Sequence, residues 1–396
     1  MSMQLSVKSR LSSTVASLKP SGIRRFFDLA ASMEGVISLG VGEPDFVTPW
    51  RMREASISSL ERGHTAYTSN AGLLELRVEI QKYLEERFSV SYHPESEILV
   101  TVGASEAIDI ALRAILDPGD EVLVVEPCYV SYEPVIRLAG GVPVFLKTSM
   151  ENQFKLTPQE LEAGITPKTK AIIFCYPNNP TGGTMTAEEW KTLLPIIEKH
   201  DLLVISDEIY AELTYGRMHD SIAALPGMKE RTILISGFSK AFAMTGWRLG
   251  YVCAMPDLLA GMLKIHQYTM LCAPTMAQMA ALEALRHGRA DMERMIESYR
   301  QRRNFVVDGF RQIGLSCHEP DGAFYAFPSI ASTGMSSAEF AEKLLMEEKV
   351  AVVPGDVFGE SGHGHIRCSY ATSMEQLKKA LDRMERFMGK WSEATR

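Results

Sequence analysis

The sequence has little of what would suit it to a membrane or a nucleic acid. Its net charge is −8 at pH 7 over 396 residues, so no excess of basic side chains favours nucleic acid or an anionic lipid surface. No apolar run approaches the roughly 18 residues of a membrane-spanning helix. We therefore expect neither nucleic acid nor a membrane among the partners of this protein.

Cysteines are few and scattered. The six of them form no C-x-x-C pair and none of the spacings of a zinc site, and several, such as Cys175 and Cys253, lie inside apolar runs. This pattern predicts buried free thiols in a reducing compartment, and no bound metal. A secretory signal is also missing, so we expect a cytoplasmic protein.

Short apolar runs that alternate with helical patterns dominate the sequence from residue 98 to residue 254. Each run is apolar throughout, which is typical of a strand buried on both faces of a mostly parallel sheet. The expected strands are 98–102, 121–125, 142–146, 170–175, 202–206, 232–235 and 249–254. Long amphipathic helices follow from about residue 275, mixed with short strands. We therefore predict an α/β protein with a large doubly wound, mostly parallel sheet domain and a smaller α+β domain.

The predicted domain boundaries follow from this change of pattern. The large domain is expected at 47–285 and the small C-terminal domain at 286–396, with 1–46 forming an N-terminal arm and part of the small domain. In open α/β sheets, ligands bind at the carboxyl ends of the strands. Polar residues that directly follow a strand are therefore the candidates for a functional site.

Two of these strand ends offer groups for an anion and for a polar ligand. Gly103, Ala104 and Ser105 follow the first strand and open a helix, whose backbone N–H groups favour an anion. A plain serine cap is the alternative interpretation. Asn179 lies in a rigid Pro-Asn-Asn-Pro loop after the strand 170–175, where it could donate to an oxygen of a ligand.

Asp207 directly follows the strand 202–206. An unpaired carboxylate at the end of a buried sheet would cost several kcal/mol, so it needs a cation, such as a protonated pyridine nitrogen. Tyr210, three residues later, could reach the same ligand. The alternative for Asp207 is the N-cap of a helix.

Lys240 and Arg248 follow the strand 232–235. A lysine buried at a strand end becomes a nucleophile, although most lysines are solvated surface residues. The guanidinium of Arg248 suits a phosphate. A lysine that forms an imine beside a phosphate site is the arrangement that pyridoxal phosphate requires. Arg367, in an apolar strand, needs an acid: a substrate carboxylate, or a structural partner that the sequence does not identify.

The stretch that holds Lys240 reads Ser-x-x-Ser-Lys-x-x-x-Met-Thr-Gly-Trp-Arg-x-Gly over residues 236–250. It closely resembles the lysine signature of the class I/II pyridoxal-phosphate-dependent aminotransferases of fold type I, which include aspartate and aromatic aminotransferases. The order and spacing of the strand-end motifs match that family over nearly the whole chain. The resemblance implies pyridoxal 5′-phosphate as cofactor, and amino acids and 2-oxoacids as substrates.

The resemblance also implies a role for each candidate residue. Lys240 is similar to the lysine that forms the imine and moves the proton, Asp207 to the acid beside the ring nitrogen, and Tyr210 and Asn179 to the donors to the phenolic oxygen. Residues similar to the phosphate cup are Gly103, Ala104, Ser105 and Arg248, and Tyr129 is similar to the residue that stacks on the ring. A phosphate-binding hydroxyl is common three residues before the lysine, where this chain has Gly237, so Ser236 or Ser239 must replace it.

On the substrate side, Arg367 resembles the clamp on the α-carboxylate, with Gly42 contributing a backbone N–H and Asn179 a further contact. Tyr67 resembles a tyrosine that reaches the phosphate of a partner subunit, which implies a homodimer with shared sites. The first 25 residues are basic and carry no acid, as in a transit peptide. Because the family pattern begins soon afterwards, we interpret them as an arm that crosses to the partner.

The implied activity is transfer of an amino group between an amino acid and a 2-oxoacid, with aspartate, alanine or an aromatic amino acid as donor and 2-oxoglutarate as acceptor. Some acid-specific relatives carry a lysine just inside the phosphate-cup helix, where this chain has Ser105, Glu106 and Ala107. Two alternatives remain. One is β-elimination by a C–S lyase with the same cofactor, and the other is a ligand-sensing regulator, for which the chain has no basic DNA-binding domain.

Overall fold

The computed structural model describes residues 10–19 and 33–394 of the chain. Most of the predicted N-terminal arm therefore lies outside the described residues. Its described part contains the short helix α1 (Ser13–Ser17), which lies beside α6 (Tyr132–Leu138) of the same chain. Across residues 10–19 and 33–394, none of the helices has the length and the apolar character of a membrane span.

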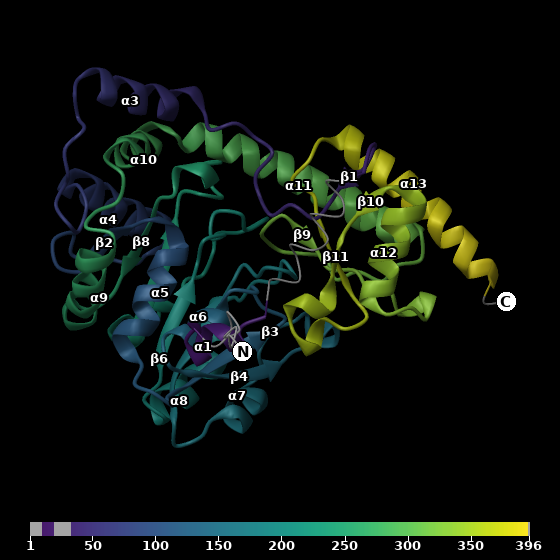
Figure 1. The fold of residues 1–396 in the computed structure, drawn as a ribbon, viewed down its shortest axis with the longest axis horizontal. Coiled ribbons are helices and arrows are strands. Elements are labelled where there is room, and N and C mark those ends of the chain that lie inside the picture. The colour runs from purple at the N-terminus through teal and green to yellow at the C-terminus, as the bar shows by residue number, and fades with distance from the viewer. Residues whose placement is uncertain (1–9, 20–32, 395–396) are drawn as a thin grey trace, which may run out of the picture.

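A seven-stranded sheet forms the centre of the larger part of the molecule (Figure 1). Its order is β2-β8-β7-β6-β5-β3-β4. The bounds are β2 (Ile98–Thr101), β3 (Glu121–Glu126), β4 (Val142–Lys147), β5 (Thr169–Cys175), β6 (Leu203–Asp207), β7 (Thr232–Gly237) and β8 (Gly250–Cys253). Neighbours from β7 to β4 are parallel, whereas β8 is antiparallel to both β2 and β7. The predicted mostly parallel α/β sheet is confirmed.

Helices cover both faces of this sheet, which explains the continuous apolar runs. Within β3, Val122 and Val124 pack with one group of helices, while Leu123 and Val125 pack with the other. The first group is α5 (Gly103–Ile115), α6 and α9 (Pro256–Thr269), and the second is α7 (Pro158–Gly164) and α8 (Ala187–Lys199). Both faces of the strands are therefore buried, as the sequence predicts.

The helix α10 (Thr275–His287) packs against both α3 (Trp50–Glu61) and α4 (Leu74–Phe88), and α4 lies beside β2. From there α11 (Arg289–Gln312) leads to the C-terminal part of the molecule (Figure 1). That part holds the antiparallel sheet β11-β12-β9, made of β11 (Val353–Pro354), β12 (Ile366–Ser369) and β9 (Tyr325–Ala326), together with α12 (Ser337–Glu348) and α13 (Met374–Ala394).

An N-terminal strand completes the C-terminal part. Strand β1 (Ile37–Ser38) pairs in parallel with β10 (Val350–Ala351), so chain segments more than 300 residues apart lie side by side. This pairing agrees with the prediction that residues before position 47 join the small domain. The boundaries at 46/47 and 285/286 themselves stay a prediction.

Candidate active site

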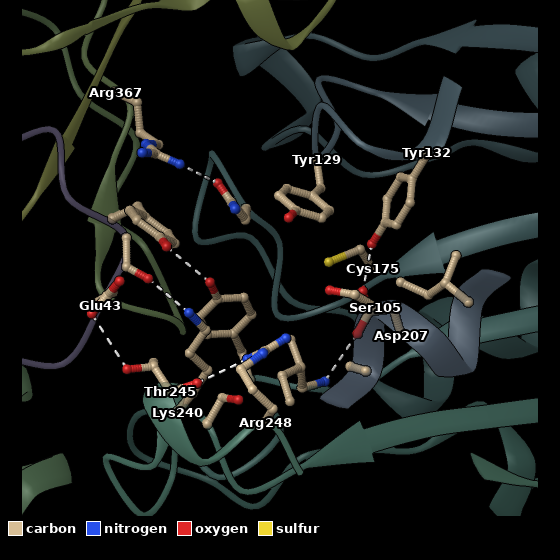
Figure 2. Close-up of a pocket in the computed structure, with 18 of the residues that line it drawn as sticks. Glu43, Ser105, Tyr129, Tyr132, Cys175, Asp207, Lys240, Thr245, Arg248 and Arg367 are labelled. Carbon is tan, nitrogen blue, oxygen red and sulfur yellow. Dashed lines mark hydrogen bonds between the residues drawn. The ribbon is translucent and has the colours of Figure 1, made fainter. Parts of the chain in front are cut away.

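A cavity of about 590 Å³ opens at the carboxyl ends of β5, β6 and β7 and at the start of α5 (Figure 2). This is the edge of the sheet where ligands bind in open α/β folds. The cavity brings together most of the predicted site residues: Gly42, Ala104, Ser105, Tyr129, Asn179, Asp207, Tyr210, Ser239, Lys240, Arg248 and Arg367. Three predicted residues, Gly103, Ser236 and Tyr67, do not line it.

Lys240 extends from the turn after β7 into this cavity. Its Nζ donates to the Gly42 carbonyl oxygen at 2.7 Å and lies 5.6 Å from the ring centre of Tyr210. Burial of the side chain lowers the pKa of Lys240 to about 8. A substantial fraction of the amine is therefore neutral near pH 8, which makes it a nucleophile and a base.

Asp207 is the last residue of β6 and is only 4% exposed. Its Oδ2 accepts a hydrogen bond from the Tyr132 hydroxyl at 2.7 Å, and its Oδ1 accepts one from the Ile209 N–H at 3.3 Å (Figure 2). Among the described residues no cation forms an ion pair with it, and burial raises the pKa of Asp207 to about 6. A turn follows it rather than a helix, so it caps none. The carboxylate could hold a cationic nitrogen in the cavity.

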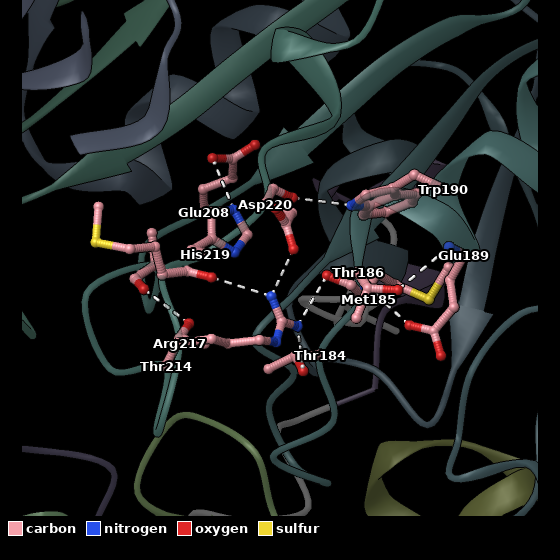
Figure 3. Close-up of polar contacts among 12 residues, drawn as sticks. Thr184, Met185, Thr186, Glu189, Trp190, Glu208, Thr214, Arg217, His219 and Asp220 are labelled. Carbon is pink, nitrogen blue, oxygen red and sulfur yellow. Dashed lines mark hydrogen bonds and ion pairs between the residues drawn. The ribbon is translucent and has the colours of Figure 1, made fainter. Parts of the chain in front are cut away.

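The residue after Asp207 anchors this turn from behind. The Glu208 carboxylate accepts from the Ser221 hydroxyl at 2.7 Å. It also contacts His219 Nε2 at 3.0 Å (Figure 3). Arg217 in turn holds the loop that carries His219 and Ser221 (Figure 3). Its guanidinium pairs with Asp220 and donates to Thr184 and Met185, which precede α8. These contacts hold Glu208, the first residue after β6, on the side away from the cavity.

The start of α5 and Arg248 form a cradle for an anion. Gly103 opens the helix with a φ of +78°, and a Cβ at this position would lie only 2.8 Å from Arg248 Nη2. Ala104 and Ser105 line the cavity next to it, at the positive end of the helix dipole. Backbone N–H groups, a hydroxyl and a guanidinium thus converge where a phosphate could be held.

The glycine at position 237 has a packing reason. Gly237 pairs with Gly250 across β7 and β8, and a Cβ on Gly237 would lie 2.8 Å from the Cα of Gly250. The two candidate serines lie in different places. Ser236 points away from the cavity and donates to the Glu208 carbonyl oxygen at 3.2 Å, whereas Ser239 lines the cavity. This placement favours Ser239 as the phosphate-binding hydroxyl, and that role stays a prediction.

Gly250 allows the phosphate cradle to sit against the sheet. A Cβ on Gly250 would lie 2.7 Å from the Ala104 N atom and 2.7 Å from the Gly103 carbonyl carbon. We expect Gly250→Ala to lower the free energy of unfolding by about 1–3 kcal/mol and to weaken phosphate binding, because the start of α5 must move. Thermal unfolding and titration with pyridoxal phosphate measure both effects.

The control for this substitution is Gly261→Ala. Gly261 lies in α9, where a Cβ would meet only Ala114 Cβ at an ordinary 3.8 Å. Alanine also has the higher helix propensity, so this variant should be as stable as the parent or more so. Equal stability and equal cofactor affinity of the Gly250 and Gly261 variants would contradict the role of the close approach.

Arg367, in β12, is 3% exposed and held on all sides. Its Nη1 donates to Asn179 Oδ1 at 2.8 Å and its Nη2 to the Gly40 carbonyl oxygen at 2.7 Å. Its Nε has no hydrogen-bond partner among the described residues. The rings of Tyr325 and Phe358 lie 4.5 and 4.9 Å from the guanidinium. In the described ranges no carboxylate pairs with it, so the structural ion pair considered from the sequence is not formed.

Two tyrosines of the cavity were missed by the sequence analysis. Tyr132 donates to Asp207, and the hydroxyl of Tyr325 lies 2.8 Å from that of Tyr210. Tyr132 is the first residue of α6 and Tyr325 lies in β9, and an aromatic residue in such an element is ordinarily a core residue. The one signal in the sequence for Tyr132 as a site residue is its place near the start of α6, shortly after β3 ends. Tyr129 was predicted, and its ring packs edge-on against Tyr132.

Tyr67 lies away from the cavity and is 79% exposed. Its predicted contact with the phosphate of a partner subunit stays a prediction. The cysteines are free, and five of the six are buried, but Cys272 is partly exposed, which corrects the expectation of buried thiols at that position. Within residues 10–19 and 33–394, no group of His, Cys, Asp and Glu could hold a metal ion.

The cavity fits pyridoxal phosphate on three independent points. The buried Asp207 lacks a cationic partner among the described residues, the cradle at Gly103 and Arg248 suits a phosphate, and Lys240 offers a partly neutral amine between them. Burial of these polar and charged groups without a ligand would cost free energy. Together they match the ring nitrogen, the phosphate and the aldehyde of one molecule.

Comparisons with known proteins agree with this chemistry. The model of the family "Aminotransferase class I and II" matches residues 34–384. A putative aminotransferase of Bacillus subtilis, YugH, is 63% identical over 96% of this chain and 99% of its own. An aspartate aminotransferase of Pyrococcus abyssi is 46% identical over 94% and 96%. The crystal structure of an aromatic aminotransferase from Pyrococcus horikoshii has a TM-score of 0.88 at 43% identity, over 93% and 99%.

Proposed function

Since the chain belongs to the aminotransferases of class I and II, we propose that it uses aspartate, alanine or an aromatic amino acid as donor and 2-oxoglutarate as acceptor. Membership of the family makes the protein a pyridoxal-phosphate-dependent transaminase with the corresponding α/β fold. Relatives named for aspartate and for aromatic amino acids support the proposed donors. The observation that carries the proposal is the convergence of Lys240, Asp207 and Arg367 on one cavity.

A panel of donors with 2-oxoglutarate tests the substrates. Transamination of aspartate, alanine or an aromatic amino acid would support the proposal, and activity restricted to other donors would refute it. The C–S lyase alternative predicts release of pyruvate and ammonia from a cysteine derivative without any acceptor. The relatives named as aminotransferases favour transamination over both this alternative and a regulator.

Bound pyridoxal phosphate supplies an electron sink for the pair left on the substrate Cα when its proton departs. The chain's own residues place and move that proton. We propose that Lys240 would hold the cofactor covalently at rest and would be set free when the amine of the substrate takes its place. Its free amine would then be the base that takes the proton from the substrate Cα and delivers it to the cofactor. A pKa of about 8 suits both directions, because the amine gains and loses a proton near neutral pH.

The residues around the ring would act by holding it. Asp207 would keep the ring nitrogen protonated, since its carboxylate is buried and points into the cavity. The Tyr210 hydroxyl and the Asn179 amide N–H would donate to the phenolic oxygen, and Tyr129 would stack on the ring. The phosphate would lie among Gly103, Ala104, Ser105, Ser239 and Arg248.

Arg367 would bind the α-carboxylate that every amino acid shares. We expect Arg367→Ala to raise KM for all amino acid donors by a similar factor, about 10²-fold, because a charge-assisted hydrogen-bonded pair is worth roughly 1.5–3 kcal/mol. Steady-state kinetics with aspartate, alanine and phenylalanine measure the effect. A rise confined to dicarboxylic donors would show that Arg367 reads the side chain instead.

Arg217→Ala is the matched control for this test. Arg217 is also held by several hydrogen bonds, to Asp220, Thr184 and Met185, but it does not line the cavity. The control should lower stability through lost contacts while KM changes little. A rise in KM of equal size in both variants would indicate a general loss of structure rather than a lost carboxylate contact.

We also propose a homodimer whose subunits share their active sites. Support comes from an exposed apolar surface around Tyr67, Tyr268, Met270 and Leu271, where Asn70 Nδ2 donates to the Leu271 carbonyl oxygen and ties the two segments together. Light scattering of the purified protein tests the dimer. The free cysteines support a reducing compartment, and we propose the cytoplasm and amino acid metabolism as the setting.

A further inference from the structure

Two tyrosine hydroxyls form a hydrogen-bonded pair in the cavity. The Oη atoms of Tyr210 and Tyr325 lie 2.8 Å apart, and the residues are 4% and 1% exposed. Tyr210 follows β6 and Tyr325 belongs to β9, so the pair joins the central sheet to the antiparallel sheet of the C-terminal part. Burial raises the pKa of both phenols, so each keeps its single proton at neutral pH.

The number of protons sets the direction of this hydrogen bond. A phenol has one O–H to donate and oxygen lone pairs that accept. If the Tyr210 hydroxyl donates its one hydrogen bond to the phenolic oxygen of the cofactor, as proposed above, it cannot also donate to Tyr325. Tyr325 must then be the donor to the Tyr210 oxygen. A hydrogen bond received in this way strengthens the bond that the receiving hydroxyl donates.

We propose that Tyr325 is a positioning residue that donates to the Tyr210 hydroxyl, and thereby fixes and strengthens the hydrogen bond from Tyr210 to the cofactor's phenolic oxygen. This inference rests on the proposed function of Tyr210. It gives Tyr325 two separable tasks. Its hydroxyl acts on Tyr210, and its ring lies against the guanidinium of Arg367 at 4.5 Å.

The backbone of Gly42 restricts the place of the Tyr325 hydroxyl. A Cβ on Gly42 would lie 2.7 Å from the Tyr325 Oη. The hydroxyl is therefore held between Gly42 on one side and Tyr210 on the other. A methyl group at position 42 would push the hydroxyl out of line with Tyr210 while leaving its proton in place.

The test is a spectrophotometric pH titration of the holoenzyme without substrate. The midpoint measured is the pH at which the imine between Lys240 and the cofactor loses its proton. A donor that stabilises the negative phenolic oxygen lowers the proton affinity of this imine. Loss of such a donor should therefore raise the midpoint. Tyr210→Phe removes a hydrogen bond to a charged oxygen and should raise it by about 1–2 pH units. Tyr325→Phe should raise it in the same direction by about 0.1–0.6 unit. Gly42→Ala should give a rise of similar size.

The double variant of Tyr210→Phe and Tyr325→Phe makes the test specific. Its midpoint should equal that of Tyr210→Phe alone, because Tyr325 acts only through Tyr210. Tyr325→Phe keeps the ring over Arg367, whereas Tyr325→Leu removes it, so KM for amino acids should rise more in Tyr325→Leu than in Tyr325→Phe. Tyr83→Phe is the control, since its hydroxyl donates to Glu212 at 2.6 Å outside the cavity, and it should shift nothing.

Three results would overturn the proposal. An unchanged midpoint in Tyr325→Phe, beside a shift in Tyr210→Phe, would leave the function of the enzyme intact and refute the role of Tyr325 alone. Additive shifts in the double variant would show that Tyr325 acts on the cofactor by another path. An unchanged midpoint in Tyr210→Phe would refute the role of Tyr210 and, with it, this inference.

Discussion

Replacement of Lys240 by alanine is expected to lower kcat for transamination by at least about 10⁴-fold, the upper range for loss of a general base. The variant loses the base beside the substrate Cα and the nucleophile that links the cofactor to the chain. The visible absorption of the lysine-linked cofactor should vanish as well. Absorption spectroscopy and steady-state rates with a reactive donor measure the two effects.

Two further variants show whether the loss is specific. Lys240→Arg keeps a positive charge in the cavity but cannot form the covalent link, so it should be as inactive as the alanine variant. Lys170→Ala removes a partly exposed lysine that pairs with Asp120, and it should turn over normally. Turnover of Lys240→Ala at the parent rate would refute the proposed mechanism.

Replacement of Asp207 by alanine is expected to lower kcat by about 10²–10³-fold, the cost of removing one preorganised electrostatic partner. The buried carboxylate is the group that would hold a proton on the ring nitrogen, and without it the ring draws electrons less strongly. The covalent link at Lys240 should still form, so the visible absorption should survive. The primary isotope effect with Cα-deuterated donor should increase, because proton removal becomes more strongly rate-limiting.

Asp207→Asn separates the charge of this residue from its shape. The amide can still accept from the Tyr132 hydroxyl, which lies 2.7 Å from Oδ2, but it offers no negative charge. We expect a loss close to that of the alanine variant. Full kcat in either variant would contradict the electron-sink role, whereas a loss in alanine alone would point to packing.

The sheet and the catalytic groups at its strand ends were predictable because they depend on local sequence. Continuous apolar runs indicated the buried strands, and these runs form the seven strands of the central sheet. Asp207 and Lys240 follow such strands directly, so parallel strand order alone brings them to one edge.

Features that depend on distant contacts were not predictable in this way. The helix α9 was missed, although Pro256 stands at its first position, and the antiparallel direction of β8 leaves no mark in a four-residue apolar run. Ser236 and Ser239 are equally polar in the sequence. The pairing of β7 with β6 brings Ser236 beside Glu208, whose carbonyl oxygen accepts from the Ser236 hydroxyl. Tyr325 gains its role from Tyr210, 115 residues away.

The immobile guanidinium of Arg367 has a consequence for entropy. A free arginine side chain carries about 2 kcal/mol of rotamer entropy, which a ligand must ordinarily remove when it binds. Here Asn179, Gly40 and two aromatic rings have already removed it during folding. Donor and acceptor acids carry the same carboxylate, so both bind to the proposed clamp without that loss. Discrimination among amino acids, and likewise among 2-oxoacids, must therefore arise where their side chains differ.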